Sequence, residues 1–353
     1  MNYADSHVHL RDGMKQSHKE TIKHGLEVAR DTGVVAVFDM PNTDPAIMTR
    51  DLVEQRLRLA RDANIPEVFY GLYVGLTSNR EQVKQAVQIC RDFFPHVVGM
   101  KLYAGHSVGN LGVTLLEEQE IVYETLSREG YQGILAVHAE KEDKINSSLF
   151  NSLKPKTHCT HARPEIAEIE SVRDQITLAT NYKFPGKLHI AHISSPGAVA
   201  LVQEAKKTGL DISCGICPHH FIYDWDMMAE KEGILWKMNP PLRSPESRAK
   251  MFKSLLIGEI DWIETDHAPH SLKEKSEDPF MSGIPGLPWF GLFEEYLRRN
   301  EFPDSRIKQV LLEEMIKRFG IKFPKSKAKR IDRTKDYPLN AYKPIEILLN
   351  WRQ

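Results

Sequence analysis

The chain has 353 residues, with 47 Lys and Arg against 48 Asp and Glu, so its formal net charge is −1. This balance argues against nucleic acid or an anionic membrane surface as a partner and favours a small molecule. No basic stretch followed by an apolar run opens the sequence, and no segment has eighteen uninterrupted apolar residues. The four cysteines are too scattered for a disulfide framework. We therefore expect a cytoplasmic protein without a membrane span.

Eight short apolar runs recur along the chain, each followed by polar residues and then by a helix-like segment. The runs are rich in β-branched residues and apolar on both faces, which is typical of strands in a parallel sheet. In chain order they cover residues 4–10, 33–40, 67–74, 96–103, 133–140, 187–194, 210–218 and 260–267.

Segments with helical spacing lie between these runs, the clearest being 49–64, 80–94, 116–130, 163–180 and 197–209. Ser, Thr, Asp or Pro stands near their starts and Gly near their ends, as capping requires. Eight βα units predict a closed (β/α)₈ TIM barrel over residues 1–320. An open doubly wound sheet is the alternative, but no GxGxxG follows the first run. Residues 321–353 form a basic extension, which we expect to pack on the barrel or to be partly flexible.

Polar residues stand at the C-terminal ends of the predicted strands, where active sites of such barrels lie. His7 and His9 are one residue apart on the first strand, so both side chains point to the same face. A single histidine in an apolar run is more often a core residue than a ligand. A cluster of buried ionisable groups is costly, however, unless the groups are paired or bind a metal. The later members of this cluster are Asn42, Lys101, His138, His192 and Asp266.

Lys101 lies in the apolar stretch VVGMKLYAG, which would bury it. An ammonium group cannot bind a metal cation. If burial lowers its pKa, the neutral amine can add carbon dioxide and form an anionic carbamate, which can bridge two metals. A lysine paired with a nearby carboxylate is the alternative.

Nine motifs, taken in order, closely resemble those of the dihydroorotases of the amidohydrolase superfamily, from residue 5 to about residue 287. They are DSHVHLRDG, MPNTDPA, GMKLYAG, AVHAEKED, LHIAHISSPGAV, CPHHF, KMNPPLRS, ETDHAPH and GIPGL. The resemblance implies a metallohydrolase barrel with two Zn²⁺ ions, bridged by a hydroxide and by a carboxylated Lys101. Its other ligands would be His7, His9 and Asp266 for one ion and His138 and His192 for the second.

The resemblance also implies an activity, the reversible cyclisation of N-carbamoyl-L-aspartate to L-dihydroorotate in de novo pyrimidine biosynthesis. Asp266 would act as general base and acid beside the metal-bridging hydroxide. The guanidinium group of Arg11 would bind the substrate carboxylate. Further substrate contacts would come from Asn42 and His270 at the carboxylate, and from Asn239 and the backbone around Ser282 and Gly283 at the ring amides.

Two other functions stay open. A hydantoinase or an allantoinase would share the metals, but such relatives generally lack an arginine at the position of Arg11. An inactive dihydroorotase-like scaffold subunit would be expected to have lost metal ligands, whereas all six are present. The longer members of the family usually carry a flanking β-sandwich, for which this sequence has no recognisable segment. The resemblance is compatible with a homodimer.

Other candidate residues have simpler interpretations. Cys214 and Cys217 form a CGIC stretch that resembles half of a zinc ribbon, but no second CxxC exists, so we expect both to pack. His219 and His220 belong to the PHH motif and are expected to be structural. His158 either supports the site or is exposed.

Overall fold

The computed structural model describes residues 1–13, 15–106, 111–230, 232–327 and 329–351. Eight parallel strands follow one another in sequence order around a single sheet. A parallel bridge between Val8 and His267 closes the circle, and the backbone N–H of His9 donates to the His267 carbonyl at 2.8 Å. The predicted (β/α)₈ barrel is confirmed. The strands are β1 (Tyr3–Val8), β2 (Val34–Asp39), β3 (Phe69–Gly75), β4 (Val97–Tyr103), β5 (Ile134–His138), β6 (Lys187–Ile190), β7 (Ile212–Ile216) and β8 (Trp262–Ile263).

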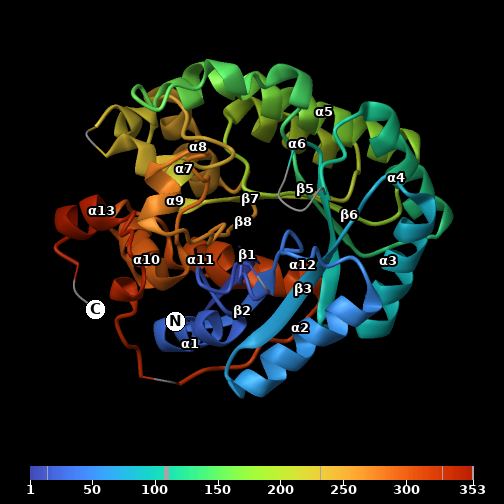
Figure 1. Ribbon diagram of the computed structural model, residues 1–353, viewed down its shortest axis with the longest axis horizontal. Coiled ribbons are helices and arrows are strands. Elements are labelled where there is room, and N and C mark those ends of the chain that lie inside the picture. The colour runs from blue at the N-terminus through green and yellow to red at the C-terminus, as the bar shows by residue number, and fades with distance from the viewer. Residues whose placement is uncertain (14, 107–110, 231, 328, 352–353) are drawn as a thin grey trace.

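Helices surround the strands (Figure 1). The predicted segment 49–64 begins and ends as its capping residues predict: Thr49 caps the first turn of α2, and Asn64 closes its end with a left-handed φ of 54°. Among the described residues the helices are α1 (Ile22–Thr32), α2 (Arg50–Ala63), α3 (Arg80–Phe93), α4 (Leu116–Arg128), α5 (Glu165–Asn181), α6 (Pro196–Lys207), α7 (Pro218–Ile222), α8 (Pro245–Ile257), α9 (Leu272–Ser276), α10 (Phe290–Arg299), α11 (Asp304–Lys308), α12 (Glu314–Phe319) and α13 (Lys343–Leu348). None of the described helices is long and apolar enough to cross a bilayer.

Six strands end earlier than the sequence pattern predicts, and β6, β7 and β8 show why. β7 stops at Ile216 because Cys217 and Pro218 begin α7. β6 and β8 stop before His192 and Asp266, which adopt left-handed φ values of 41° and 49°. A residue in this conformation cannot continue a parallel ladder. Some of the polar residues at the C-terminal end of the barrel therefore lie just beyond the last residue of their strands.

The opposite end of the barrel interior is filled with apolar side chains. Phe38 of β2, Trp262 of β8 and Phe319 of α12 are buried there, and the rings of Phe38 and Phe319 lie 4.6 Å apart, edge to face. The strands also bury their outer faces against the surrounding helices in one continuous core. Since one end of the interior is packed, the polar residues collect at the other.

The C-terminal segment runs along the outside of the barrel past α1 to α13, in red in Figure 1. Arg330 donates to the hydroxyl of Tyr3 at 2.9 Å, and the N–H of Ile331 donates to the carbonyl of Asp31 at 2.8 Å. Further along, the Tyr337 hydroxyl donates to the buried carboxylate of Glu20 at 2.7 Å. In the part of the chain that the structure describes, this segment is anchored to the barrel and every strand belongs to the barrel sheet.

Candidate metal and substrate site

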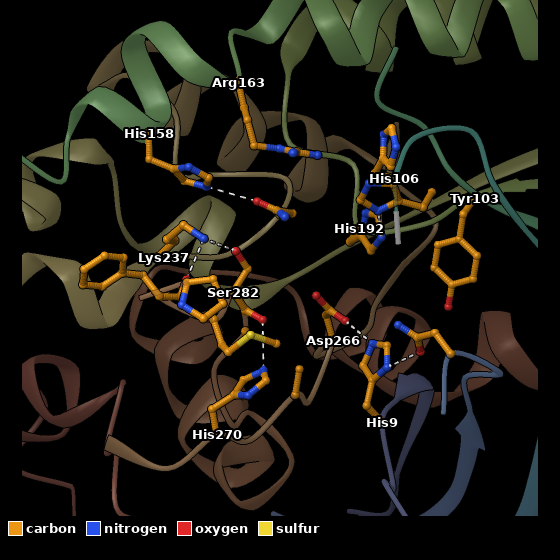
Figure 2. Close-up of a pocket in the computed structure, with 18 of the residues that line it drawn as sticks. His9, Tyr103, His106, His158, Arg163, His192, Lys237, Asp266, His270 and Ser282 are labelled. Atoms are coloured by element: carbon orange, nitrogen blue, oxygen red, sulfur yellow. Dashed lines mark hydrogen bonds and ion pairs between the residues drawn. The ribbon is translucent and has the colours of Figure 1, made fainter. Parts of the chain in front are cut away.

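A cavity of about 520 Å³ opens at the C-terminal ends of the strands. In Figure 2, His9, Asp266 and His192 lie on one side of it and His270, Ser282 and Lys237 on the other. Of the predicted site residues, only Lys101 does not line the wall. The wall contains His7, His9, Arg11, Asn42, His138, His192, Asn239, Asp266, His270, Ser282 and Gly283.

His7, His9 and Asp266 form a compact group whose ligand atoms all lie within 4.8 Å of one another. Oδ1 of Asp266 lies 2.8 Å from Nε2 of His9 and 3.3 Å from Nε2 of His7. Nδ1 of His9 lies 2.8 Å from the side-chain oxygen of Asn42. With its proton on Nδ1, His9 presents the lone pair of Nε2 toward Asp266. Two imidazoles and a carboxylate converging in this way fit a metal cation.

His138 and His192 form a second group beside the first. Nδ1 of His138 and Nε2 of His192 lie 3.1 Å apart, and the rings of His7 and His192 are 5.0 Å apart. Burial, together with nearby Lys101, lowers the pKa of both His7 and His192 well below the usual value. The rings are therefore neutral at neutral pH, which is the form that binds metals.

Lys101 lies beneath the two histidine groups. Its side chain is completely buried, and Nζ has no hydrogen-bond partner among the described residues. Burial lowers the pKa of Lys101 to about 8, so part of the amine is neutral near physiological pH. An unpartnered buried amine is costly, and a carbamate that bridges two metals would remove this cost. The donor set thus fits a pair of metal ions.

Arg11 lies on the wall of the cavity, 5% exposed, and its Nε has no hydrogen-bond partner among the described residues. One terminal nitrogen lies 3.4 Å from Nε2 of His270. Burial and the neighbouring cations Arg11 and Lys19 lower the pKa of His270. The neutral His270 ring can then donate from Nε2 to the Ser282 carbonyl, 3.1 Å away. With Nε2 of His270 donating to Ser282, the guanidinium of Arg11 keeps its own donors for an anion.

The loop residues predicted to contact substrate depend on His158, for which the sequence left two interpretations open, and on Lys237 and Lys275, which the sequence did not single out. Nε2 of His158 lies 3.0 Å from the side-chain oxygen of Asn239. Lys237 donates to the hydroxyl oxygen of Ser282 at 2.9 Å, and the fully buried Lys275 donates to the Gly283 carbonyl at 2.9 Å. His158 is 4% exposed, so it supports the site and the exposed alternative is wrong. Lys237 lies in the motif KMNPPLRS and Lys275 lies just after ETDHAPH, but no hydrophobic periodicity in the sequence indicates their roles.

Cys217, His219 and His220 also lie close together and are buried. Nδ1 of His219 is 3.4 Å from the Tyr342 hydroxyl, and Nε2 of His220 is 3.0 Å from the Pro240 carbonyl. These contacts attach α7 to the loop that carries Asn239 and to the C-terminal segment. We assign this group to packing.

The chain resembles known proteins in sequence and in fold. It is 32% identical over 274 residues to a dihydroorotase of Lactobacillus acidophilus, a match that covers 77% of this chain and 61% of the relative. It is 30% identical over 325 residues to a dihydroorotase of Lactobacillus helveticus, covering 90% of this chain and 73% of the relative. The chain thus spans less than two thirds of the first relative's length and somewhat more than two thirds of the second's.

Solved structures share the architecture. An L-hydantoinase from Arthrobacter aurescens superposes with a TM-score of 0.78 at 22% identity, covering 94% of this chain and 74% of that one. At this identity the match shows the fold alone. No protein-family model matches the chain. The identity to the dihydroorotases over most of the chain shows the family: this protein belongs to the dihydroorotases of the amidohydrolase superfamily.

Proposed function

We propose that the protein is a dihydroorotase, a metal-dependent hydrolase that acts on a cyclic amide C–N bond and works in the biosynthetic direction in pyrimidine synthesis. One observation carries the proposal: a single cavity holds both a cluster of metal-binding side chains and the guanidinium of Arg11. Such a cavity suits a small substrate with an amide carbonyl at one end and a carboxylate at the other. L-dihydroorotate and N-carbamoyl-L-aspartate have these two features.

The residues that would hold two Zn²⁺ ions are those of the two histidine groups, with Lys101 between them. The neutral Lys101 amine would add carbon dioxide, forming an N–C bond and losing one proton, and the resulting carbamate would bridge the ions. When bound, the metals supply a hydroxide at neutral pH and polarise the substrate carbonyl. The ligands would be His7, His9 and Asp266 on one ion and His138 and His192 on the other.

The chain's own residues would bind the substrate and move the proton. Arg11 would hold the substrate carboxylate, with Asn42 and His270 beside it, while Asn239 and the backbone at Ser282 and Gly283 would hold the ring amides. In cyclisation, Asp266 would take a proton from the ureido nitrogen as the C–N bond forms, and give it to the oxygen of the attacked carboxylate, which leaves as hydroxide. In hydrolysis the same proton would return to the ring nitrogen.

A hydantoinase-type activity is the second candidate, because the fold is shared with the hydantoinase from Arthrobacter aurescens. Such an enzyme would use the same metal half of the cavity. Its substrates lack the ring carboxylate that would pair with Arg11, so the buried arginine favours dihydroorotate. The four free, buried cysteines fit a reducing compartment such as the cytoplasm. We propose a homodimer, which light scattering can test.

The deciding experiment is a turnover assay on L-dihydroorotate, allantoin and a 5-substituted hydantoin, with zinc quantified in the same preparation. We expect zinc-loaded protein to hydrolyse dihydroorotate and to form it from N-carbamoyl-L-aspartate. Zinc-loaded protein that leaves dihydroorotate unchanged would contradict the proposal, and preferential turnover of the hydantoin or of allantoin would establish the second candidate.

A further inference from the structure

A buried carboxylate lies directly beneath the proposed metal site. Glu264 follows β8 and is 1% exposed. Its Oε2 accepts from the hydroxyl of Ser6 at 2.5 Å and from the indole N–H of Trp262 at 3.2 Å, and it lies 3.3 Å from Nε2 of His189. Groups from three strands, β1, β6 and β8, thus hold this one oxygen.

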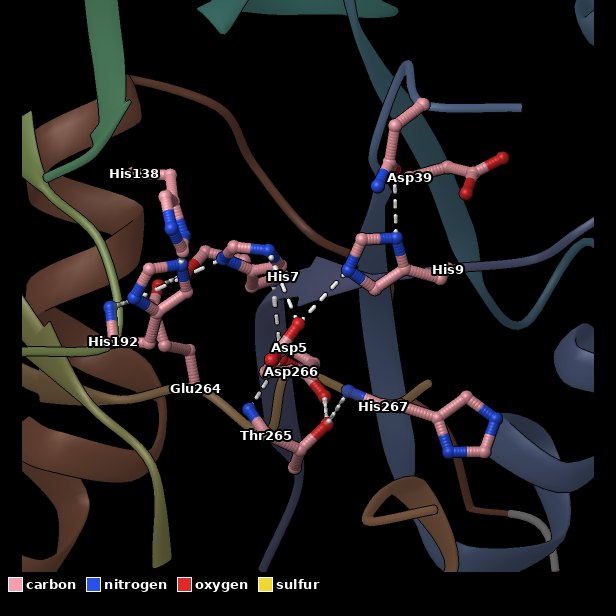
Figure 3. A network of polar contacts seen from close by, with 12 residues as sticks. Asp5, His7, His9, Asp39, His138, His192, Glu264, Thr265, Asp266 and His267 are labelled. Atoms are coloured by element: carbon pink, nitrogen blue, oxygen red, sulfur yellow. Dashed lines mark hydrogen bonds and ion pairs between the residues drawn. The ribbon is translucent and has the colours of Figure 1, made fainter. Parts of the chain in front are cut away.

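The other oxygen of Glu264 faces both groups of histidine ligands (Figure 3). Oε1 accepts from the backbone N–H of His192 at 2.6 Å. His192 lies beyond the end of β6 and has a left-handed backbone conformation, so its N–H does not pair with a neighbouring strand. The carboxylate of Glu264 accepts this hydrogen bond instead. Oε1 also lies 4.0 Å from Nδ1 of His7, which has no hydrogen-bond partner among the described residues. Nε2 of the same ring faces Asp266 at 3.3 Å.

The neighbouring strand leaves space for this carboxylate. A Cβ atom on Gly215 of β7 would lie 2.6 Å from Cδ of Glu264 and 2.7 Å from its Oε1. Any larger residue at position 215 would therefore displace the carboxylate. Gly215 is the glycine of the CGIC stretch. The space that Glu264 needs explains a glycine at this position without a zinc ribbon.

Glu264 carries a negative charge that the nearby protein groups compensate only in part. Among its polar partners, the Ser6 hydroxyl and Nε2 of His189 lie 2.5 Å and 3.3 Å from Oε2. No Lys or Arg forms an ion pair with Glu264 among the described residues. A buried anion of this kind costs several kcal/mol unless positive charge lies nearby. Metal cations directly above it would supply that charge.

We infer that Glu264 is a positioning residue for both halves of the metal site, fixing the His192 backbone and orienting the His7 ring, and that its charge strengthens metal binding. With a metal on Nε2 of His7, the Nδ1–H would face Glu264 across 4.0 Å, an arrangement of the carboxylate–histidine–metal type. This inference rests on the proposed metal function, but Glu264 itself lies outside the ligand set.

The test compares zinc affinity among variants, measured by competition with a chromophoric chelator. Glu264→Gln keeps the shape and an oxygen for His192 but removes the charge, and we expect zinc binding to weaken by about 10- to 100-fold. Gly215→Ala should produce a similar loss by pushing the carboxylate aside. The matched control is Asp31→Asn, which removes a carboxylate that is 3% exposed at the opposite end of the barrel, paired with Arg333. The control should lower stability without changing zinc affinity.

A second readout uses the metal-free protein. Hydrogen exchange at the His192 N–H should be slow in the wild type and faster in Glu264→Ala, because the acceptor is gone. Unchanged zinc affinity in Glu264→Gln would overturn the role of the charge, and unchanged His192 exchange would overturn the positioning role. Wild-type protein that binds no zinc would refute the proposed function and the charge role together, while the exchange measurement would still decide the positioning role.

Discussion

The two sides of the cavity are built in different ways. On one side, His7, His138, His192 and Asp266 sit at or just beyond the ends of strands, and the barrel ladder and its core hold them. We call this the strand side. On the other, Ser282 belongs to a loop that side-chain hydrogen bonds hold. We call this the loop side, and it also includes Asn239 and Gly283.

Because the two sides are held in different ways, we expect changes on each side to affect different kinetic constants. The strand side is held by the barrel ladder and carries the proposed metal ligands and the proposed proton carrier, so a change there should abolish chemistry. The loop side depends on a few hydrogen bonds from Lys237, Lys275 and His158, so a change there should mainly weaken substrate binding. The comparison is supported if strand-side variants lower mainly kcat and loop-side variants raise mainly KM. It is wrong if variants on either side change both constants.

The largest effect should come from Lys101→Ala on the strand side. Without the proposed bridging carbamate the second metal should be lost, and we expect kcat to fall by at least about 10³-fold, equivalent to about 4 kcal/mol of barrier. Zinc per chain should fall from two toward one. Short carboxylic acids should restore part of the lost kcat and part of the lost zinc, since they can occupy the bridging position. An unchanged rate and zinc content would refute the carbamate.

Arg11→Met should produce the next largest effect, at the point where the two sides meet. Removing a charge-assisted contact with the substrate carboxylate costs about 1.5–3 kcal/mol, or about 10- to 100-fold in kcat/KM. We expect most of this loss in KM for dihydroorotate. The control is Arg58→Met on the surface of α2, where the arginine is 56% exposed. Equal kinetics for the two variants would remove the role assigned to Arg11.

The strand side could be predicted from the sequence because it depends on local pattern. Alternation of side chains in a strand puts His7 and His9 on one face, and the barrel fold brings the strand ends together. The early ends of β6 and β8 could not be predicted in the same way. The left-handed residues His192 and Asp266 depend on contacts with groups distant in the sequence, such as the hydrogen bond that the His192 N–H donates to Glu264.

The loop side shows where prediction from the sequence stops. The family resemblance points to Asn239, Ser282 and Gly283 but not to the residues that hold them. Lys237 and Lys275 meet across a separation of 38 residues, where the Lys275 ammonium donates to the Lys237 carbonyl at 2.7 Å. Neither hydrophobic period nor capping chemistry encodes such a contact. Only the folded structure places these two lysines beside the loop.

Lys275→Met tests the loop side directly. The methionine keeps the length of the side chain but leaves the carbonyls of Lys237 and Gly283 without their donor, at a cost of about 1–3 kcal/mol each. We expect KM for dihydroorotate to rise about 10-fold while kcat and zinc content change little. The control is Lys273→Met on the same helix, where the lysine is 78% exposed. A fall in kcat with unchanged KM would contradict the division between the two sides.

The smallest effect should come from His24, which joins the C-terminal segment to the barrel. Its ring lies 2.6 Å from Glu20 and 3.0 Å from Asp336, and the hydrogen bond with Glu20 raises the pKa of His24 to about 9. Because the folded-state pKa is raised, this stabilisation is complete below about pH 6.5 and is lost as pH rises through about 9. Solvent screening at this half-buried position limits it to about 1 kcal/mol.

His24→Gln should therefore lower the free energy of urea unfolding near pH 6 and match the wild type near pH 10. His18→Gln is the control, because His18 is 61% exposed and lies 3.9 Å from Glu274. An equal loss at both pH values would show that the contact is not electrostatic. Glu20 also lies 3.2 Å from His267, the neighbour of Asp266. If kcat stays constant while stability falls, the C-terminal segment stabilises the barrel without shaping the strand side, which is then held by the barrel alone.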